Sequence, residues 1–149
     1  MRIIKLLHVL SHLKWIFLIW MMALMVYIFF FYTENPIKLV GTVIFLAGIM
    51  MGFDGLSDIT KISEKEKKAL LNFNYVKRQR TFLFVGTIVL MLISVLFFSV
   101  VLLFPVADKS LIADFTKLGY DCLVMILGLL CLVKQITEKA IYVNSLNNN

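Results

Sequence analysis

Four apolar runs, separated by short polar connections, limit what this chain can fold into. An α-helix needs about 20 apolar residues to cross the hydrocarbon core of a bilayer, which is about 30 Å thick. Backbone polar groups in lipid are satisfied only within helices or closed barrels. The sequence therefore predicts an all-α membrane protein with four transmembrane helices, packed as a four-helix bundle. We expect spans at about 15–33, 37–56, 81–104 and 114–134.

The composition leaves no room for a separate soluble domain. Hydrophobic residues make up 61% of the 149 residues, against about 45–50% in soluble proteins. We expect a membrane domain over residues 15–142, in which 57–80 is a basic cytoplasmic loop. An amphipathic helix at 1–14 should precede it, and a polar tail at 143–149 should be disordered.

The positive charges are distributed unevenly between the connections. Twelve of the 15 Lys and Arg residues lie in the N-terminal segment, in residues 57–80 or in the C-terminal segment. The other three lie in the two remaining connections. This bias predicts that both termini are cytoplasmic. Because the charge lies beside apolar runs, we expect anionic lipid headgroups as its partner and no nucleic acid. Short loops and a composition rich in Lys and Asn favour a bacterial plasma membrane.

The two halves of the chain could be duplicated helical hairpins. The segment "KISEKEK" follows the second span and "KQITEKA" follows the fourth, and they share I-[S/T]-E-K. Similar membrane-exit chemistry could also produce this match by coincidence.

Asp121 lies inside the fourth predicted span. The apolar stretch from Cys122 to Val133 is only about 18 Å long as a helix, so the span must begin earlier. With Ser110 as the predicted N-cap, the helix begins at about residue 111. A 20-residue span that ends at Lys134 begins at Phe115, which places Asp121 about 9 Å below the outer membrane edge. A charge at this depth should face the bundle interior or a wet crevice, and it could pair with Lys117, one turn away, or with a neighbouring helix. It is either a structural anchor or an ion or substrate contact.

A second acidic position, Asp54, lies near the end of the second span. Asp54 and Asp58 share one helix face if the helix continues, and two carboxylates one turn apart could hold a cation. The alternative is a solvated helix exit, because Asp54 is close to the inner boundary.

Four glycines in the second span form a glycine stripe, which predicts close helix packing. Gly41, Gly48, Gly52 and Gly55 fall within about 60° of one another on a helix. Small residues allow membrane helices to approach closely, and Gly48 and Gly52 form a G-x-x-x-G motif. The stripe should pack either inside the bundle or against another chain, with Asp54 projecting away from it.

The connection at 57–80 should contain a short helix. Ser63 and Glu66 fit a capping box, and Glu64 should pair with Lys68. The connection carries a basic patch, which should orient the protein and contact headgroups, or else dock a cytosolic partner. The patch consists of Lys65, Lys67, Lys68, Lys77, Arg78 and Arg80.

The sequence contains no recognisable catalytic, cofactor or metal motif. His8 and His12 are the only histidines, and Cys122 and Cys131 point to opposite sides of a helix. We therefore expect a non-enzymatic protein that acts through helix–helix contacts, as an accessory subunit, an assembly factor or a protective protein. Its partner would be another membrane protein or a second copy. The alternative is a small oligomeric transporter or channel subunit that uses Asp121 or Asp54.

Overall fold

The structure is a computed structural model that describes residues 11–31, 36–103 and 108–147. Helices are the only regular secondary structure of these residues, and four helices are long and apolar enough to cross a membrane, as predicted. The elements are η1 (Ser11–Leu13), α2 (Lys14–Phe30), α3 (Pro36–Asp54), α4 (Glu64–Leu71), α5 (Phe73–Leu103) and α6 (Lys109–Asn147). The predicted amphipathic helix falls mainly on residues 1–10, outside the described residues.

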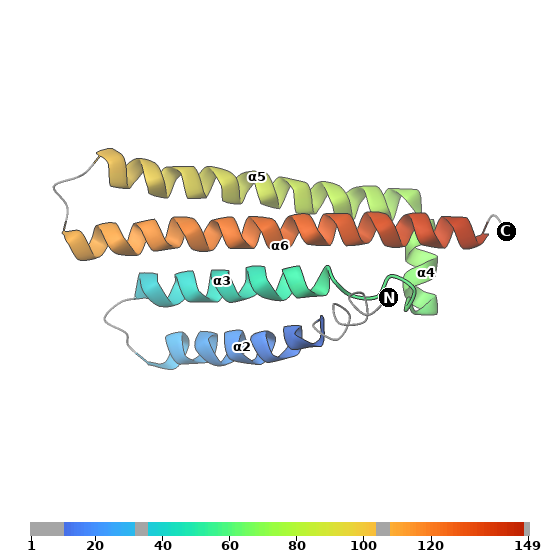
Figure 1. Ribbon diagram of the computed structural model, residues 1–149, viewed down its shortest axis with the longest axis horizontal. Helices are drawn as coiled ribbons and strands as arrows, with labels where there is room; N and C mark the ends of the chain where they lie inside the picture. Colours follow the sequence, from blue (N-terminus) through green and yellow to red (C-terminus); the bar gives the residue numbers. More distant parts are fainter. Residues whose placement is uncertain (1–10, 32–35, 104–107, 148–149) are drawn as a thin grey trace, which may run out of the picture.

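The four long helices lie side by side in a single layer, in the order α5, α6, α3, α2 (Figure 1). The central helices α3 and α6 run in the same direction, and the edge helices α2 and α5 run in the opposite one. Among the described residues, extensive contacts join each helix to its neighbours in the row, and no comparable contact joins α2 to α5. The spans therefore do not close into the expected bundle. Lipid chains are as apolar as side chains, so no hydrophobic force closes the layer.

The helices differ in length, and the longer pair forms a small second core. With 17 and 19 residues, α2 and α3 are about 26 and 28 Å long. With 31 and 39 residues, α5 and α6 are about 46 and 58 Å long, so they extend beyond the other pair. The extension packs against α4 at one end of the layer, which we call the α4 end; the opposite end is the far end (Figure 1). The core there consists of Leu70, Val76, Ala140 and Val143.

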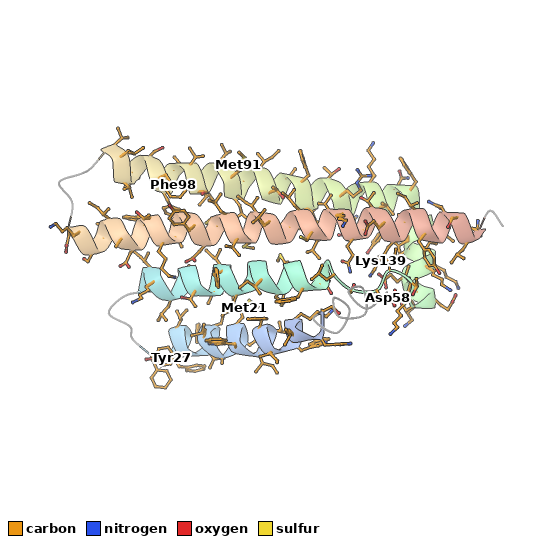
Figure 2. All side chains as sticks on the ribbon, in the orientation of Figure 1. Met21, Tyr27, Asp58, Met91, Phe98 and Lys139 are labelled. Atoms are coloured by element: carbon orange, nitrogen blue, oxygen red, sulfur yellow. The ribbon has the colours of Figure 1, made fainter. Side chains whose placement is uncertain are left out.

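The C-terminal segment is helical through Asn147, so the prediction of a disordered tail from residue 143 was wrong for residues 143–147. Val143 is 4% exposed because it packs in the same core as Leu70 and Val76. Lys139 also pairs with Glu66 of α4 at 2.8 Å, and Lys139 points towards α4 in Figure 2. These contacts from a distant segment hold a polar sequence in a helix.

The helix α6 begins at Lys109, two residues earlier than a predicted N-cap at Ser110 implies. Asp108, rather than Ser110, precedes the helix, and its side chain accepts a hydrogen bond from the Ser110 amide at 3.2 Å. The Asp108 carbonyl also accepts from the Ile112 amide at 3.0 Å. Aspartate and serine are both good N-caps, and here the aspartate takes that place.

Candidate functional site

The contact between α3 and α6 is the closest in the molecule and contains most of the polar groups predicted to matter. Gly41 and Gly48 on α3, and Gly55 directly after its end, face α6 at steps of seven residues. A seven-residue step keeps side chains on one seam between two nearly parallel helices. We call this contact the central seam. It brings α3 against Asp121 at the far end and against Gln135 at the α4 end.

In the middle of the seam, backbone meets backbone. A Cβ placed on Gly48 would lie 2.6 Å from the Met125 Cα, and a Cβ on Gly128 would lie 2.3 Å from the Gly48 carbonyl oxygen. A Cβ on Gly55 would lie 2.7 Å from the Cys131 Cβ. No side chain fits between the helices at these positions. The structure thus places Gly48 and Gly55, like Gly41, at a close contact inside the molecule.

Gly52 does not belong to the seam, although it completes the G-x-x-x-G motif. Apart from its chain neighbours and the backbone of its own helix, no described atom lies within 4 Å of a Cβ placed on Gly52. Gly52 therefore does not pack inside the molecule, because the seam follows steps of seven residues rather than four, and packing of Gly52 against another chain stays a prediction. A four-residue step rotates the position by about 40° from Gly48, whereas a seven-residue step rotates it by only about 20°.

Asp121 is buried at the far end of the seam, 5% exposed, and it pairs with Lys117 as predicted. The Lys117 Nζ lies 3.0 Å from the Asp121 Oδ2 and 3.4 Å from the Thr42 hydroxyl on α3, to which it also donates. The carboxylate packs on Gly41, where a Cβ would lie 2.5 Å from Oδ2. Lys117 remains 43% exposed, so the pair is accessible through the lysine. This geometry joins α6 to α3 by charge-assisted contacts.

Gln135 forms the polar contact at the α4 end of the seam, and the sequence analysis did not identify it. Its Nε2 donates to the Asp54 carbonyl at 2.9 Å and to the Ser57 hydroxyl, and the side chain is buried. The carbonyls of the last helical turn have no partner within their own helix. Gln135 supplies a donor for the end of α3. A glutamine beside Lys134 at the end of an apolar run was the feature that could have indicated this role.

The Asp54 carboxylate contacts the beginning of α2. It pairs with Lys14 at the beginning of α2, a partner that the sequence analysis did not propose. The helix ends at Asp54, so Asp58 does not share its face; the Asp58 carboxylate accepts from the Thr60 amide at 3.0 Å and hydroxyl at 2.7 Å. Among the described residues, no group of three or more His, Cys, Asp or Glu could hold a metal ion.

The other side of α6 contacts α5 through a second close approach. The Ser94 hydroxyl donates to the Gly119 carbonyl at 3.1 Å, and a Cβ on Gly119 would lie 2.9 Å from the Phe98 ring. Phe98 lies over α6 in Figure 2. Gly119 and Gly128 were both missed, although the reasoning applied to the α3 glycines would have found them. Every buried side-chain nitrogen or oxygen of the described residues has a hydrogen-bond partner.

The basic patch is divided between two helices. One half of the predicted capping box forms, because Ser63 Oγ accepts from the Glu66 amide at 3.2 Å and α4 begins there. The Glu66 carboxylate pairs with Lys139 instead of completing the box. Glu64 pairs with Lys67 at 2.8 Å rather than with Lys68. The hydrogen bond from Lys67 lowers the pKa of Glu64, and the same bond raises the pKa of Lys67.

Three basic residues of the patch lie on α4 and three on the first turns of α5. Those on α4 are Lys65, Lys67 and Lys68, and those on α5 are Lys77, Arg78 and Arg80.

Comparisons of the chain with protein-family models, with curated proteins and with solved structures gave no match. Functional arguments for this protein therefore start from its own geometry.

Proposed function

We propose that this protein is a non-enzymatic multi-pass membrane protein that acts through helix–helix contacts, as an accessory subunit, an assembly factor or a protective protein. The observation that carries the proposal is the exposure of α2. None of its 17 residues, all of which the structure describes, is buried. Only the Lys14 pair with Asp54 and the stacking of Phe17 on Phe53, with ring centroids 5.6 Å apart, attach its beginning to α3 by specific contacts.

The composition of α2 supports a protein partner rather than lipid alone. The helix contains six aromatic residues and three methionines. Aromatic residues and methionine are enriched at protein interfaces, and methionine adapts to irregular surfaces. The exposed members include Trp15, Trp20, Met22, Met25, Phe29 and Phe30. A partner helix could cover this edge of the layer. Gly48 and Gly55 are already packed against α6, so they are not free to contact a partner.

Photo-cross-linking in native membranes tests this proposal with a matched control. A photoreactive residue at Met22, 53% exposed on α2, should give one adduct of defined mass. The same residue at Met91, 59% exposed on α5 and pointing away from α6 in Figure 2, should not. The mass distinguishes another membrane protein from a second copy. If both positions give only lipid adducts, the proposal fails.

We infer that both termini are cytoplasmic in a bacterial plasma membrane, with two helical hairpins formed by α2 with α3 and by α5 with α6. Twelve of the 15 Lys and Arg residues support this orientation through the positive-inside rule. Topology reporters fused at residue 149 and inserted near residue 35 should report opposite sides. Two identical reports would contradict the four-span topology.

A small transporter or channel subunit is the second candidate, because Asp121 is a buried carboxylate whose partner Lys117 is partly exposed. Intramembrane ionisable residues often mark ion or substrate pathways. The packing of the carboxylate on Gly41 favours an anchor instead, since the α3 backbone occupies the adjacent space. Asp121→Asn distinguishes the two: a transporter should lose flux while its fold remains, and an anchor should leave function unchanged.

A further inference from the structure

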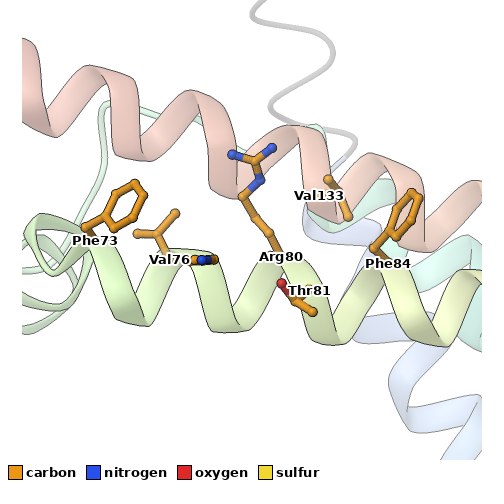
Figure 3. A pocket seen from close by; sticks show the side chains of 7 residues that line it. Phe73, Val76, Arg80, Thr81, Phe84 and Val133 are labelled. Atoms are coloured by element: carbon orange, nitrogen blue, oxygen red, sulfur yellow. The ribbon is translucent and has the colours of Figure 1, made fainter.

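A cavity of about 390 Å³ opens between α5 and α6 towards the α4 end (Figure 3). Its lining changes from apolar through basic to apolar along α5. Lys77 and Arg80 supply the charge, and Phe84 of α5 and Val133 of α6 supply the apolar part that is further from α4. In Figure 3 the Arg80 side chain extends from α5 towards α6, with Phe73 and Val76 on one side and Phe84 and Val133 on the other.

The two cations of the cavity have no carboxylate partner among the described residues. Neither Lys77 nor Arg80 takes part in any of the ion pairs found there. Nearby carboxylates are engaged by other lysines: Glu66 pairs with Lys139 at 2.8 Å, and Glu138 with Lys134 at 3.7 Å. The two residues are three apart and therefore share one helix face. The cavity thus presents two positive charges that are not neutralised by the protein.

The cavity lies at the boundary between polar and apolar sequence. On α5 the uncharged apolar run begins directly after Arg80, and on α6 it ends at Val133, just before Lys134. Residues 81–103 give about 34 Å of helix, enough to cross the hydrocarbon core. Lys77 and Arg80 are therefore placed at the level of lipid headgroups, and Phe84 is placed at the level of the upper acyl chain.

We propose that this cavity binds an anionic phospholipid. Its phosphate accepts hydrogen bonds from Arg80 and Lys77, and the first part of an acyl chain lies against Phe84 and Val133. The planar guanidinium of arginine fits a phosphate with two parallel hydrogen bonds, and lysine adds a point charge. Basic pockets between transmembrane helices commonly bind such headgroups. The site is independent of the proposed partner contact on α2, which lies on the opposite edge of the layer.

Native mass spectrometry of the full-length protein in mild detergent tests the site. The protein is titrated with phosphatidylglycerol or with phosphatidylcholine of identical acyl chains. We expect the wild type to retain phosphatidylglycerol preferentially. Each of Lys77→Gln and Arg80→Gln should reduce that preference roughly five-fold, the effect of one cation near an anionic surface. Equal retention of both lipids by the wild type would overturn the proposal.

Arg78→Gln is the matched control, because Arg78 lies between the two proposed ligands in sequence but does not line the cavity. It removes the same charge from the same helix turn, and it should leave the preference unchanged. A loss equal to that of Arg80→Gln would indicate general charge attraction and contradict a defined site. Glycerol 3-phosphate, which carries the phosphate without acyl chains, should not displace the lipid at equal concentration. If it does, the site recognises a soluble phosphate and the lipid assignment is wrong.

Discussion

The helices α2 and α6 pack against the same neighbour, α3, in different ways. Between α3 and α6 the backbones touch at Gly48 and Gly128, and a part-buried hydrogen bond joins the two helices at each end of the seam. Between α2 and α3 there is one aromatic stack and one ion pair, and α2 buries none of its residues. Both contacts join apolar spans, so apolarity alone does not determine how firmly a span is held. In lipid, close approach and satisfied polar groups determine it.

The largest loss of stability should come from a substitution in the middle of the central seam. Gly128→Ala places a Cβ 2.3 Å from a backbone oxygen that cannot rotate away, so the helices must separate. We expect a loss of about 3 kcal/mol in the free energy of unfolding, the upper end of the usual range for overpacking. Unfolding by SDS in mixed micelles measures it. Gly52→Ala is the matched control and should be nearly neutral. Equal losses for the two variants would contradict the claim that Gly128 lies in a tighter helix contact than Gly52 does.

A smaller loss is expected at the far end of the seam. Asp121→Leu removes the partner of Lys117 and crowds Gly41, and it should cost about 2 kcal/mol, less than a fully buried pair because Lys117 is partly exposed. Asp121→Asn keeps the shape and a hydrogen-bonding group, so its loss should stay below about 1 kcal/mol. The same micelle titration gives both values. A leucine variant more stable than the wild type would show that the carboxylate does not hold α3 to α6.

At the α4 end, Gln135→Leu should cost about 1 kcal/mol, the net value of a typical hydrogen bond. The change removes the Gln135 donor from the Ser57 hydroxyl and from the Asp54 carbonyl, which still accepts from the Ser57 amide at 2.9 Å. Gln79→Leu is a control on α5 with the same change of residue. The free energies of unfolding of the two variants should differ by the contribution of the Gln135 contact. Identical values would mean that this contact does not stabilise the protein.

The smallest effect on stability should come from the ion pair that attaches α2. Asp54→Asn should change the free energy of unfolding by less than about 1 kcal/mol, because both side chains are partly exposed. It should nevertheless loosen α2. Oxidative cross-linking between cysteines placed at Phe17 and Phe53, in a Cys131→Ser background, should become slower in this variant. An unchanged rate, with Glu64→Gln as the charge control, would mean that the ion pair with Lys14 does not position α2.

Features set by local sequence could be predicted, and those set by distant segments could not. Apolar length predicted the four spans and placed Asp121 inside one of them, and helical spacing predicted its pair with Lys117. The role of Gln135 was missed because its partner lies 81 residues away. The helical tail was missed for the same reason, since Val143 packs with residues of α4 and α5. The single layer depends on which helices pack through their glycines. The spacing of glycines on one helix does not show which other helix will pack against them.

The central seam joins the first half of the chain to the last helix, and this has a consequence for biogenesis. The contacts of Thr42 with Lys117 and of Asp54 with Gln135 span 75 and 81 residues. During synthesis, α3 therefore enters the bilayer with its glycine face against lipid, and it stays so until α6 has been inserted. Domains of membrane proteins whose contacts are distant in sequence assemble only after their spans are in place. A chain that ends before α6 would leave the ends of α3 without the partners that Gln135 and Lys117 provide.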